Sequence, residues 1–273
     1  MIWRFIDSGL CTPATNMAID EAIMLELEKN PNHPVIRFYD WNPPTLSIGY
    51  NQEATKEADL DILSAKGYGF VRRPTGGRAV LHKHEVTYAV IATVQGILSG
   101  SVTQSYAVIS EALSNGLHNL GIPAELEKGS VSSSSQRESA NPCFSSTSRF
   151  ELAVKGKKIV GSAQVRKNGI LLQHGSILLN ENQREMAEIL PDLNEEKRKL
   201  LARYMERKTI CVNQVSNRKI TYEEVVAAIT EGFRTVWESE IFNDLAEISV
   251  SEYNTALHLT ESKYENDSWN LKK

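Results

Sequence analysis

The sequence predicts an α+β fold, in which a mixed and largely antiparallel sheet has flanking helices and a short helical segment follows at the C-terminus. Strand-like segments dominate the first two thirds of the chain, whereas the pattern from Gln183 onward is mostly helical. Strands and helices do not alternate strictly, as they do in a doubly wound parallel sheet. We find no internal repeat, and no linker accompanies the change in composition near residue 180.

The N-terminal part combines strands with two helices. Apolar side chains recur near every 3.6 positions over 15–30 and stop at Asn30-Pro31, which predicts a helix. A second helix is expected over 56–66, ending at Gly67. Runs of β-branched and aromatic residues predict strands over 2–7, 35–41, 45–50, 85–93 and from Gly69 into a glycine turn. The strands over 35–41 and 45–50 should pair around the turn "NPP".

The middle of the chain carries the clearest boundary signals. Ser101 and Gln104 match a capping box at the start of a helix over 101–121, and Gly121 stands where a C-cap glycine is expected. The serine-rich stretch 127–142 then predicts a loop.

Three more strands are expected in the segments "FELAVKG", "KKIVGSAQVRK" and "GILLQHGSILLN". Thr221 and Glu224 match another capping box. This box predicts the start of the helix in "TYEEVVAAITEGFRTVWE".

The composition is that of a soluble globular protein, with 41% hydrophobic and 23% charged residues. A net charge of −4 argues against a general nucleic-acid-binding protein, since phosphate binding requires an excess of Lys and Arg on some face. The three cysteines are widely spaced, which fits a reducing compartment rather than a disulfide framework. There is no signal-peptide pattern and no apolar run near the roughly 20 residues that cross a bilayer. We therefore expect a cytoplasmic protein that binds neither nucleic acid nor membrane.

The segment "RRPTGGRAVLHKHE" (72–85) is the first candidate for a functional site. Pro74 stiffens the exit from the strand, and Gly76 and Gly77 can adopt a positive φ that lets a ligand approach the backbone. Backbone N–H groups in such a turn can bind an anion or a carbonyl oxygen. A hairpin turn with solvated arginines explains the same residues equally well, because the segment matches neither a Walker loop nor a dinucleotide-binding fingerprint.

The two histidines of this segment are candidate metal ligands. His82 and His84 are two residues apart on a possible strand and would then share a face. No carboxylate or cysteine follows at a suitable short spacing, so we expect no metal site.

Cys143 is the second candidate. A lone cysteine is more often a small buried hydrophobic residue than a nucleophile, and Cys11 and Cys211 fit that description. Cys143 instead follows a polar loop and stands among serines, which predicts an accessible thiol. A hairpin that turns at Gly156 would carry Lys158 back beside the start of the preceding strand, toward Cys143. An ammonium group there would favour the thiolate, which can attack a thioester carbonyl.

The motifs "RRPTGGRAVLH", "GKKIVGSAQ" and "HGSILLN", in this order, resemble those of the biotin/lipoate protein ligase catalytic domain. The resemblance covers residues 31–245. It implies that residues 1–30 pack on this domain as a strand and a helix, and that 246–273 form a helical tail. The family has a mixed sheet with flanking helices, and it comprises ATP-dependent lipoate ligases and ATP-independent octanoyl or lipoyl transferases.

A cysteine fifteen residues before the lysine resembles the octanoyltransferases that move octanoyl from acyl carrier protein to the glycine cleavage H protein. The resemblance implies that Cys143 carries the acyl thioester and that Lys158 favours its thiolate. It implies no cofactor and no metal, and we expect a monomer. It also implies that the acyl- and pantetheine-facing pocket is lined by Arg73, Gly76, Gly77, His82, Ser162, Ala163 and His174.

Three other functions stay open on the sequence. A sister group of cysteine-bearing amidotransferases moves octanoyl from H protein to other lipoyl domains and shares these motifs. An ATP-dependent lipoate ligase would place Lys158 on the phosphate, although many ligases have a third glycine where this chain has Arg78. The third alternative is a non-catalytic protein that binds acyl chains or carriers.

An acidic carrier would suit the basic residues Arg72, Arg73, Arg78, Lys83, Lys155, Lys157, Arg166 and Lys167.

Overall fold

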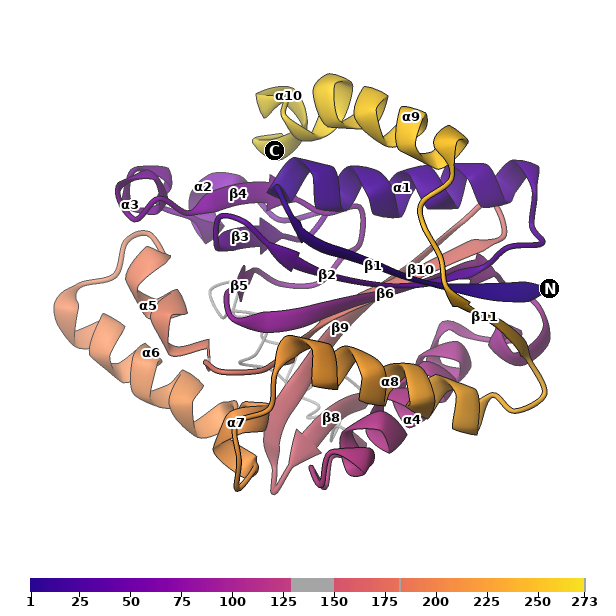
Figure 1. Ribbon diagram of the computed structural model, residues 1–273. Coiled ribbons are helices and arrows are strands. Elements are labelled where there is room, and N and C mark those ends of the chain that lie inside the picture. Colours follow the sequence, from indigo (N-terminus) through magenta and orange to yellow (C-terminus); the bar gives the residue numbers. More distant parts are fainter. Residues whose placement is uncertain (129–149, 182, 273) are drawn as a thin grey trace.

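The computed structural model describes residues 1–128, 150–181 and 183–272, which form two sheets and the helices around them (Figure 1). The strands are β1 (Ile2–Cys11), β2 (Val35–Trp41), β3 (Thr45–Ile48), β4 (Gly69–Arg72), β5 (Val80–His82), β6 (Glu85–Thr93), β7 (Glu125–Lys128), β8 (Phe150–Val154), β9 (Lys157–Lys167), β10 (Ile170–Leu178) and β11 (Ile241–Leu245).

The larger sheet has the strand order β11-β1-β2-β6-β10-β9-β8-β7, and the smaller sheet has the order β4-β3-β5. In the larger sheet, β1 pairs in parallel with β11 and β2, and the other neighbours are antiparallel. The prediction of an α+β fold with a mixed, largely antiparallel sheet is confirmed.

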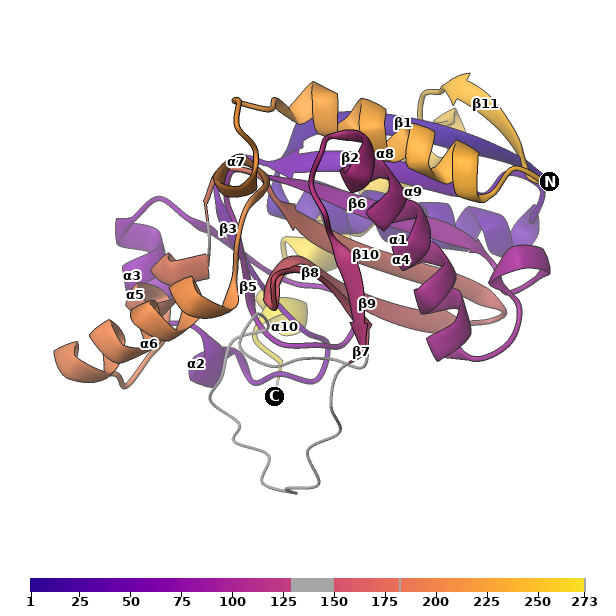
Figure 2. The same cartoon turned by 90° about the horizontal axis from the view of Figure 1, so that it is seen from below.

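Helices cover both faces of the larger sheet. In Figure 1, α1 and α9 lie above it and α4 and α8 lie below it, and Figure 2 shows α4 and α8 side by side across the lower face. The helices are α1 (Pro13–Lys29), α2 (Ala54–Glu57), α3 (Leu60–Ala65), α4 (Val102–Asn119), α5 (Met186–Ile189), α6 (Glu195–Lys208), α7 (Val212–Val215), α8 (Tyr222–Val236), α9 (Val250–Leu259) and α10 (Asp267–Asn270).

Strand β2 shows how one segment serves both faces, because successive residues of a strand point to opposite sides. Ile36 and Phe38 belong to the apolar cluster that includes Phe233 of α8. Arg37 and Tyr39 point to the other face, where both bond to side chains of α1. The candidate site lies on this second face.

The predicted pairing of the strands around "NPP" is wrong. Strand β2 pairs with β1 and β6, whereas β3 pairs with β4 and β5 in the smaller sheet. Two successive prolines offer no N–H groups to a hairpin ladder, so the chain leaves the larger sheet after Trp41.

Other boundaries also differ from the predictions. The single helix over 56–66 is two short helices, because Asp59 starts α3 by accepting a hydrogen bond from the Ile62 N–H. Glu127 and Lys128 of the predicted loop belong to β7, and the rest of that loop lies outside the described residues. Strand β11 was not predicted, because "IFNDL" lacks alternation and becomes a strand only by pairing with β1.

The local signals at helix ends are confirmed. Ser101 with Gln104 and Thr221 with Glu224 form the expected capping boxes, and Gly121 follows α4 with φ +76°. None of the helices in the described ranges is both long and apolar enough to cross a bilayer.

Candidate active site

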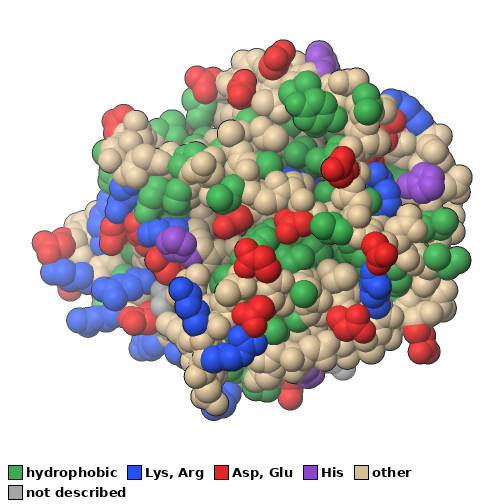
Figure 3. Space-filling view, viewed as in Figure 1, with side chains coloured by type: hydrophobic (Ala, Val, Ile, Leu, Met, Phe, Trp, Pro, Cys, Tyr) green, Lys and Arg blue, Asp and Glu red, His purple; other side chains and the backbone are tan. Residues whose placement is uncertain are grey.

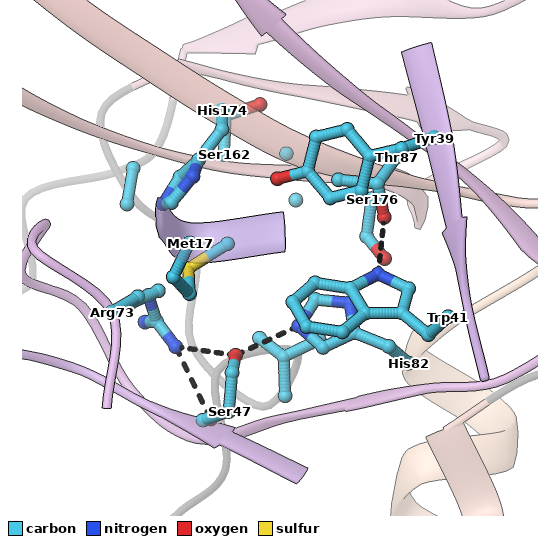
Figure 4. A pocket seen from close by; sticks show the side chains of 14 residues that line it. Met17, Tyr39, Trp41, Ser47, Arg73, His82, Thr87, Ser162, His174 and Ser176 are labelled. Carbon is cyan, nitrogen blue, oxygen red and sulfur yellow. Dashed lines mark hydrogen bonds between the residues drawn. The ribbon is translucent and has the colours of Figure 1, made fainter. Parts of the chain in front are cut away.

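A cavity lies between the larger sheet, α1 and the smaller sheet (Figure 4). Its empty space, including the part that opens to solvent, is about 380 Å³. Met17 of α1, Tyr39 and Trp41 of β2 and Val80 of β5 give it apolar and aromatic walls. The remaining lining comes from residues of β9 and β10, from Arg73 beside the glycine turn, and from Ser47, His82 and Thr87.

His174 of β10 connects the cavity to a buried carboxylate. Its Nε2 lies 2.7 Å from Thr75 Oγ1 and its Nδ1 lies 3.0 Å from Asp20 Oδ2. Asp20 also accepts hydrogen bonds from Arg37 Nη1 at 2.7 Å and from the Tyr39 hydroxyl at 3.0 Å. These bonds tie Thr75, which belongs to the glycine turn, to the sheet and to α1.

The charges in this network follow from burial. Burial lowers the pKa of His174, although the Asp20 carboxylate opposes that change. We therefore assign a neutral imidazole whose Nδ1 donates to Asp20 and whose Nε2 accepts from the Thr75 hydroxyl. Burial raises the pKa of Asp20, but Arg37 and His174 more than offset this, and the pKa lies below its ordinary value. Asp20 is thus a buried, paired carboxylate.

His82 of β5 is the centre of a second chain of hydrogen bonds. Its Nδ1 lies 2.7 Å from Glu85 Oε1 and its Nε2 lies 2.7 Å from Ser47 Oγ. Ser47 Oγ also accepts from Arg73 Nη1 at 3.0 Å, and the Trp41 ring stacks on the imidazole at 4.2 Å between centroids (Figure 4). Because these polar atoms bond to one another, they leave the aromatic and aliphatic surfaces to face the cavity.

Arg73 determines the shape of the glycine turn. Its Nη2 donates to Gly76 O at 2.9 Å and to Arg78 O at 2.6 Å. Gly77 has φ +91°, which other residues rarely adopt. The chain beneath is equally close, since a Cβ at Gly49 would lie 2.1 Å from Gly77 O. The turn is therefore fixed by the Arg73 bonds on one side and by close packing against Gly49 on the other.

The alternative of a turn with solvated arginines is wrong for two of the three residues. Arg72 is fully buried and Arg73 is 4% exposed, whereas Arg78 is half-buried. Both buried guanidinium groups bond to backbone carbonyl oxygens, which satisfies them without solvent.

Two buried polar atoms in this region have no hydrogen-bond partner among the described residues. They are Ser176 Oγ, whose residue lines the cavity, and Glu85 Oε2 beside it. Unsatisfied buried polar atoms are uncommon, and these two can bind water or a polar group of a ligand.

Lys158 lies outside this cavity, on the same strand as Gly161, which lines it. Three residues of strand separate the two by about 10 Å. Lys158 is 6% exposed, and its Nζ lies 2.7 Å from Glu151 Oε1. Its backbone pairs with Ala153, near the end of β8, whereas its side chain reaches back to Glu151, the second residue of β8. The two-residue turn at 155–156 forces the first residues of β9 to oppose the last of β8.

The structure brings most of the predicted pocket residues together. The cavity is lined by Arg73, His82, Ser162, Ala163 and His174. Gly76 and Gly77 form the adjoining turn. The Ser162 hydroxyl bonds to Tyr88 on the opposite face of the sheet, at 2.7 Å. The predicted nucleophile Cys143 lies outside the described residues.

Several residues of the site were missed in the sequence. Asp20 and Arg37 form an ion pair at 0% side-chain exposure, Glu85 holds His82, and Glu151 holds Lys158. Arg37 interrupts the apolar run "VIRFYDW", and Asp20 interrupts "NMAIDEAIM". A charge at a core position of a strand or helix is the signal that would have found them.

The two histidines near the turn do not share a face. His82 ends β5, whereas His84 has φ +51° in the following turn and an exposed side chain. In the part of the chain that the structure describes, no group of three or more His, Cys, Asp or Glu residues is placed to hold a metal ion.

Comparison with known proteins identifies the family. The family described as "Lipoyl protein ligase A/B catalytic domain" matches residues 12–234. This chain belongs to that family. A relative from Lysinibacillus sphaericus (strain C3-41), named Octanoyltransferase LipM, is 42% identical over 99% of each chain. A relative of the same name from Bacillus subtilis (strain 168) is 41% identical over 99% of this chain and 98% of its own.

Solved structures of the family share the fold. A bipartite lipoate protein ligase from Thermoplasma acidophilum, studied with its E2 lipoyl domain, aligns with TM-score 0.81 and 24% identity over 100% of this chain and 98% of its own. A lipoate-protein ligase A bound with ATP aligns with TM-score 0.79 and 24% identity over 99% of each chain. At this identity the likeness concerns the fold.

Proposed function

We propose that this chain is an octanoyltransferase that moves octanoyl from acyl carrier protein to a lysine of a lipoyl domain, without ATP. The acceptor expected first is the glycine cleavage H protein. The observation that carries the proposal is the largely apolar cavity on the strand that bears Lys158. Its walls suit an uncharged acyl chain. The relatives named octanoyltransferases match almost the full chain at 42% and 41% identity.

The reaction takes two acyl transfers through Cys143. The Cys143 thiolate attacks the thioester carbonyl, the bond to the carrier sulfur breaks, and the carrier thiolate leaves and takes up a proton. The neutral amine of the acceptor lysine then attacks the new thioester, which forms the amide and releases the Cys143 thiolate. The proton lost from the amine passes to a base or to water. Backbone N–H groups are the natural donors to the oxyanion of each step.

Lys158 is assigned to favour the thiolate of Cys143. The Glu151 carboxylate accepts a hydrogen bond from Lys158 Nζ at 2.7 Å and fixes the place of that side chain. Glu151 is therefore proposed as the residue that positions Lys158.

A basic surface next to Lys158 suits an acidic carrier protein. Of the basic residues expected from the sequence, Arg72 and Arg73 are buried and Lys83 bonds to Glu185 at 2.8 Å. Basic residues of helix α6 take their place in this surface. The helix ends beside Lys158, because the Lys158 carbonyl accepts a hydrogen bond from the Ile210 N–H at 3.0 Å. Figure 3 shows Lys and Arg side chains gathered at the end of the molecule that carries α6. The proposed surface consists of Lys155, Lys157, Arg203, Arg207 and Lys208.

The first experiment measures the intact mass of the protein after mixing with octanoyl-acyl carrier protein in the absence of ATP. We expect a gain of one octanoyl group that hydroxylamine releases, because a thioester reacts with hydroxylamine more readily than an oxygen ester does. The Cys143→Ser variant should lack this gain, because serine is a weaker nucleophile. Cys11→Ser is the matched control and should acylate like the wild type.

Other results would select one of the alternatives. Acceptor labelling that needs lipoate and ATP, and that survives Cys143→Ser, would make the chain a ligase. Octanoyl bound without transfer to any lipoyl domain would make it an acyl-binding protein. Acylation by octanoyl-H protein but not by octanoyl-acyl carrier protein would make it an amidotransferase.

A further inference from the structure

Arg72, at the end of β4, binds two distant segments through its guanidinium group. It is fully buried, and no carboxylate of the described residues forms an ion pair with it. After β3 it donates to the carbonyl oxygens of Gly49 and Tyr50, both at 3.1 Å, and of Gln52. Near the C-terminus it donates to the carbonyl oxygens of Trp269 (2.9 Å), Asn270 (3.1 Å) and Lys272 (2.7 Å).

The C-terminal segment 264–272 also bonds to the backbone of β4. Asn270 Oδ1 accepts from the Arg72 N–H at 2.9 Å, and Trp269 Nε1 donates to Arg72 O at 2.8 Å. Asn270 Nδ2 donates to Tyr264 O at 2.7 Å, which holds the side chain in place. Among the described strands, β4 is an edge strand that pairs only with β3, so this segment covers the edge that the sheet leaves open.

The same arginine supports the cavity from behind. Arg73, the next residue, points to the opposite side and lines the cavity. The segment held by Arg72 lies against the glycine turn, where the Tyr50 N–H donates to Thr75 O at 2.8 Å and Gly49 approaches Gly77. Loss of the Arg72 bonds would therefore release both the strand end that carries Arg73 and the chain beneath the turn.

We propose that Arg72 and segment 264–272 form a brace that positions the glycine turn for acyl binding. The inference rests on the proposed function, since it assigns the turn to the acyl site. A guanidinium is required because its fixed fork reaches six carbonyl oxygens of two segments, whereas an ammonium has three donors at a single point. Arg72 does not touch the cavity, so it is a positioning residue.

Asn270→Ala tests the brace, with Leu271→Ala as the matched control. Asn270 bonds to β4, whereas the side chain of Leu271 is 36% exposed and makes no bond to Arg72. Hydrogen exchange of the amides over 73–78 should be faster in Asn270→Ala than in the wild type, and unchanged in Leu271→Ala. The KM for the octanoyl donor should rise about tenfold with a small change in kcat, because the turn is misplaced while the reacting groups are intact. Arg72→Lys should shift both readouts in the same direction and further.

The outcomes separate the brace from the proposed function. A lower melting temperature of Asn270→Ala, with wild-type exchange over 73–78 and wild-type KM, would overturn the brace and leave the segment a purely stabilising one. Hydrogen exchange does not depend on activity, so it decides the brace even if the wild type transfers no octanoyl group.

Discussion

The two faces of the larger sheet are equally buried but differ in chemistry. Between the sheet and helices α4 and α8, Phe38, Phe233 and Trp237 are fully buried in an apolar cluster. On the face toward α1, Asp20 and Arg37 are just as buried and are charged. Charges are costly to bury, so a protein keeps them inside only where geometry demands them. The distribution of buried charge, rather than burial itself, therefore indicates where the site lies.

Asp20→Asn should have the largest effect, because it leaves Arg37 buried without a counter-charge. Breaking one partner of a buried ion pair costs about 3–5 kcal/mol. We expect that loss in the free energy of unfolding, measured by urea denaturation at pH 7. Glu195→Gln is the control, since it removes an exposed ion pair with Lys199 and should cost about 0.5 kcal/mol or less. Equal losses in the two variants would show that the buried pair contributes no more to stability than an exposed one.

Much of the fold was predictable because its signals are local. The capping boxes at Ser101 and Thr221 and the alternating run of β6 depend only on neighbouring residues. The assignment of β3 to a second sheet and the existence of β11 depend on pairing partners far along the chain. Local patterns carry no information about those partners, which explains both errors.

The site was predictable only at residues that belong to a recognisable sequence motif. The turn around Gly76 and the strand residues Ala163 and His174 came from such motifs, and the structure brings their surroundings together. Arg72 and Arg73 looked alike in the sequence, yet one braces the C-terminal segment and the other lines the cavity. Adjacent residues of a strand point to opposite sides, and only the tertiary structure shows what each side contains.

Matched valines on the two faces should separate stability from specificity. Val80 lines the cavity and Val225 belongs to the apolar cluster of α8, and both are buried. Each change to alanine should cost about 1–3 kcal/mol of unfolding free energy, because it removes buried methyl groups. Only Val80→Ala enlarges the cavity, so only this variant should move the preferred acyl chain to greater length. The check is kcat/KM for hexanoyl to dodecanoyl donors, and a shift in Val225→Ala would contradict the assignment of the faces.

Asp40 of β2 offers the smallest and most specific test, since its carboxyl accepts from the Trp41 N–H and forms no ion pair with a described residue. Burial, opposed by the Trp41 N–H and assisted by Glu85, raises the pKa of Asp40 to about 6. Between about pH 4, where the unfolded carboxyl titrates, and about pH 6, the native state binds more protons than the unfolded state. The contribution of Asp40 to stability therefore falls as the pH rises through this window. Because Asp40 is partly solvated, Asp40→Asn should be more stable than the wild type at pH 7 by about 1 kcal/mol.

The Asp40→Asn advantage should disappear by pH 4, where both side chains are neutral, and urea denaturation at pH 4, 5.5 and 7 measures it. The asparagine oxygen can still accept from the Trp41 N–H, so that hydrogen bond is retained in the variant. A difference that stays constant with pH would mean that packing, not charge, sets the effect at this position. The contrast between the two faces would then rest on the bonded pairs around Asp20 and Glu85, with no contribution from the charge of Asp40.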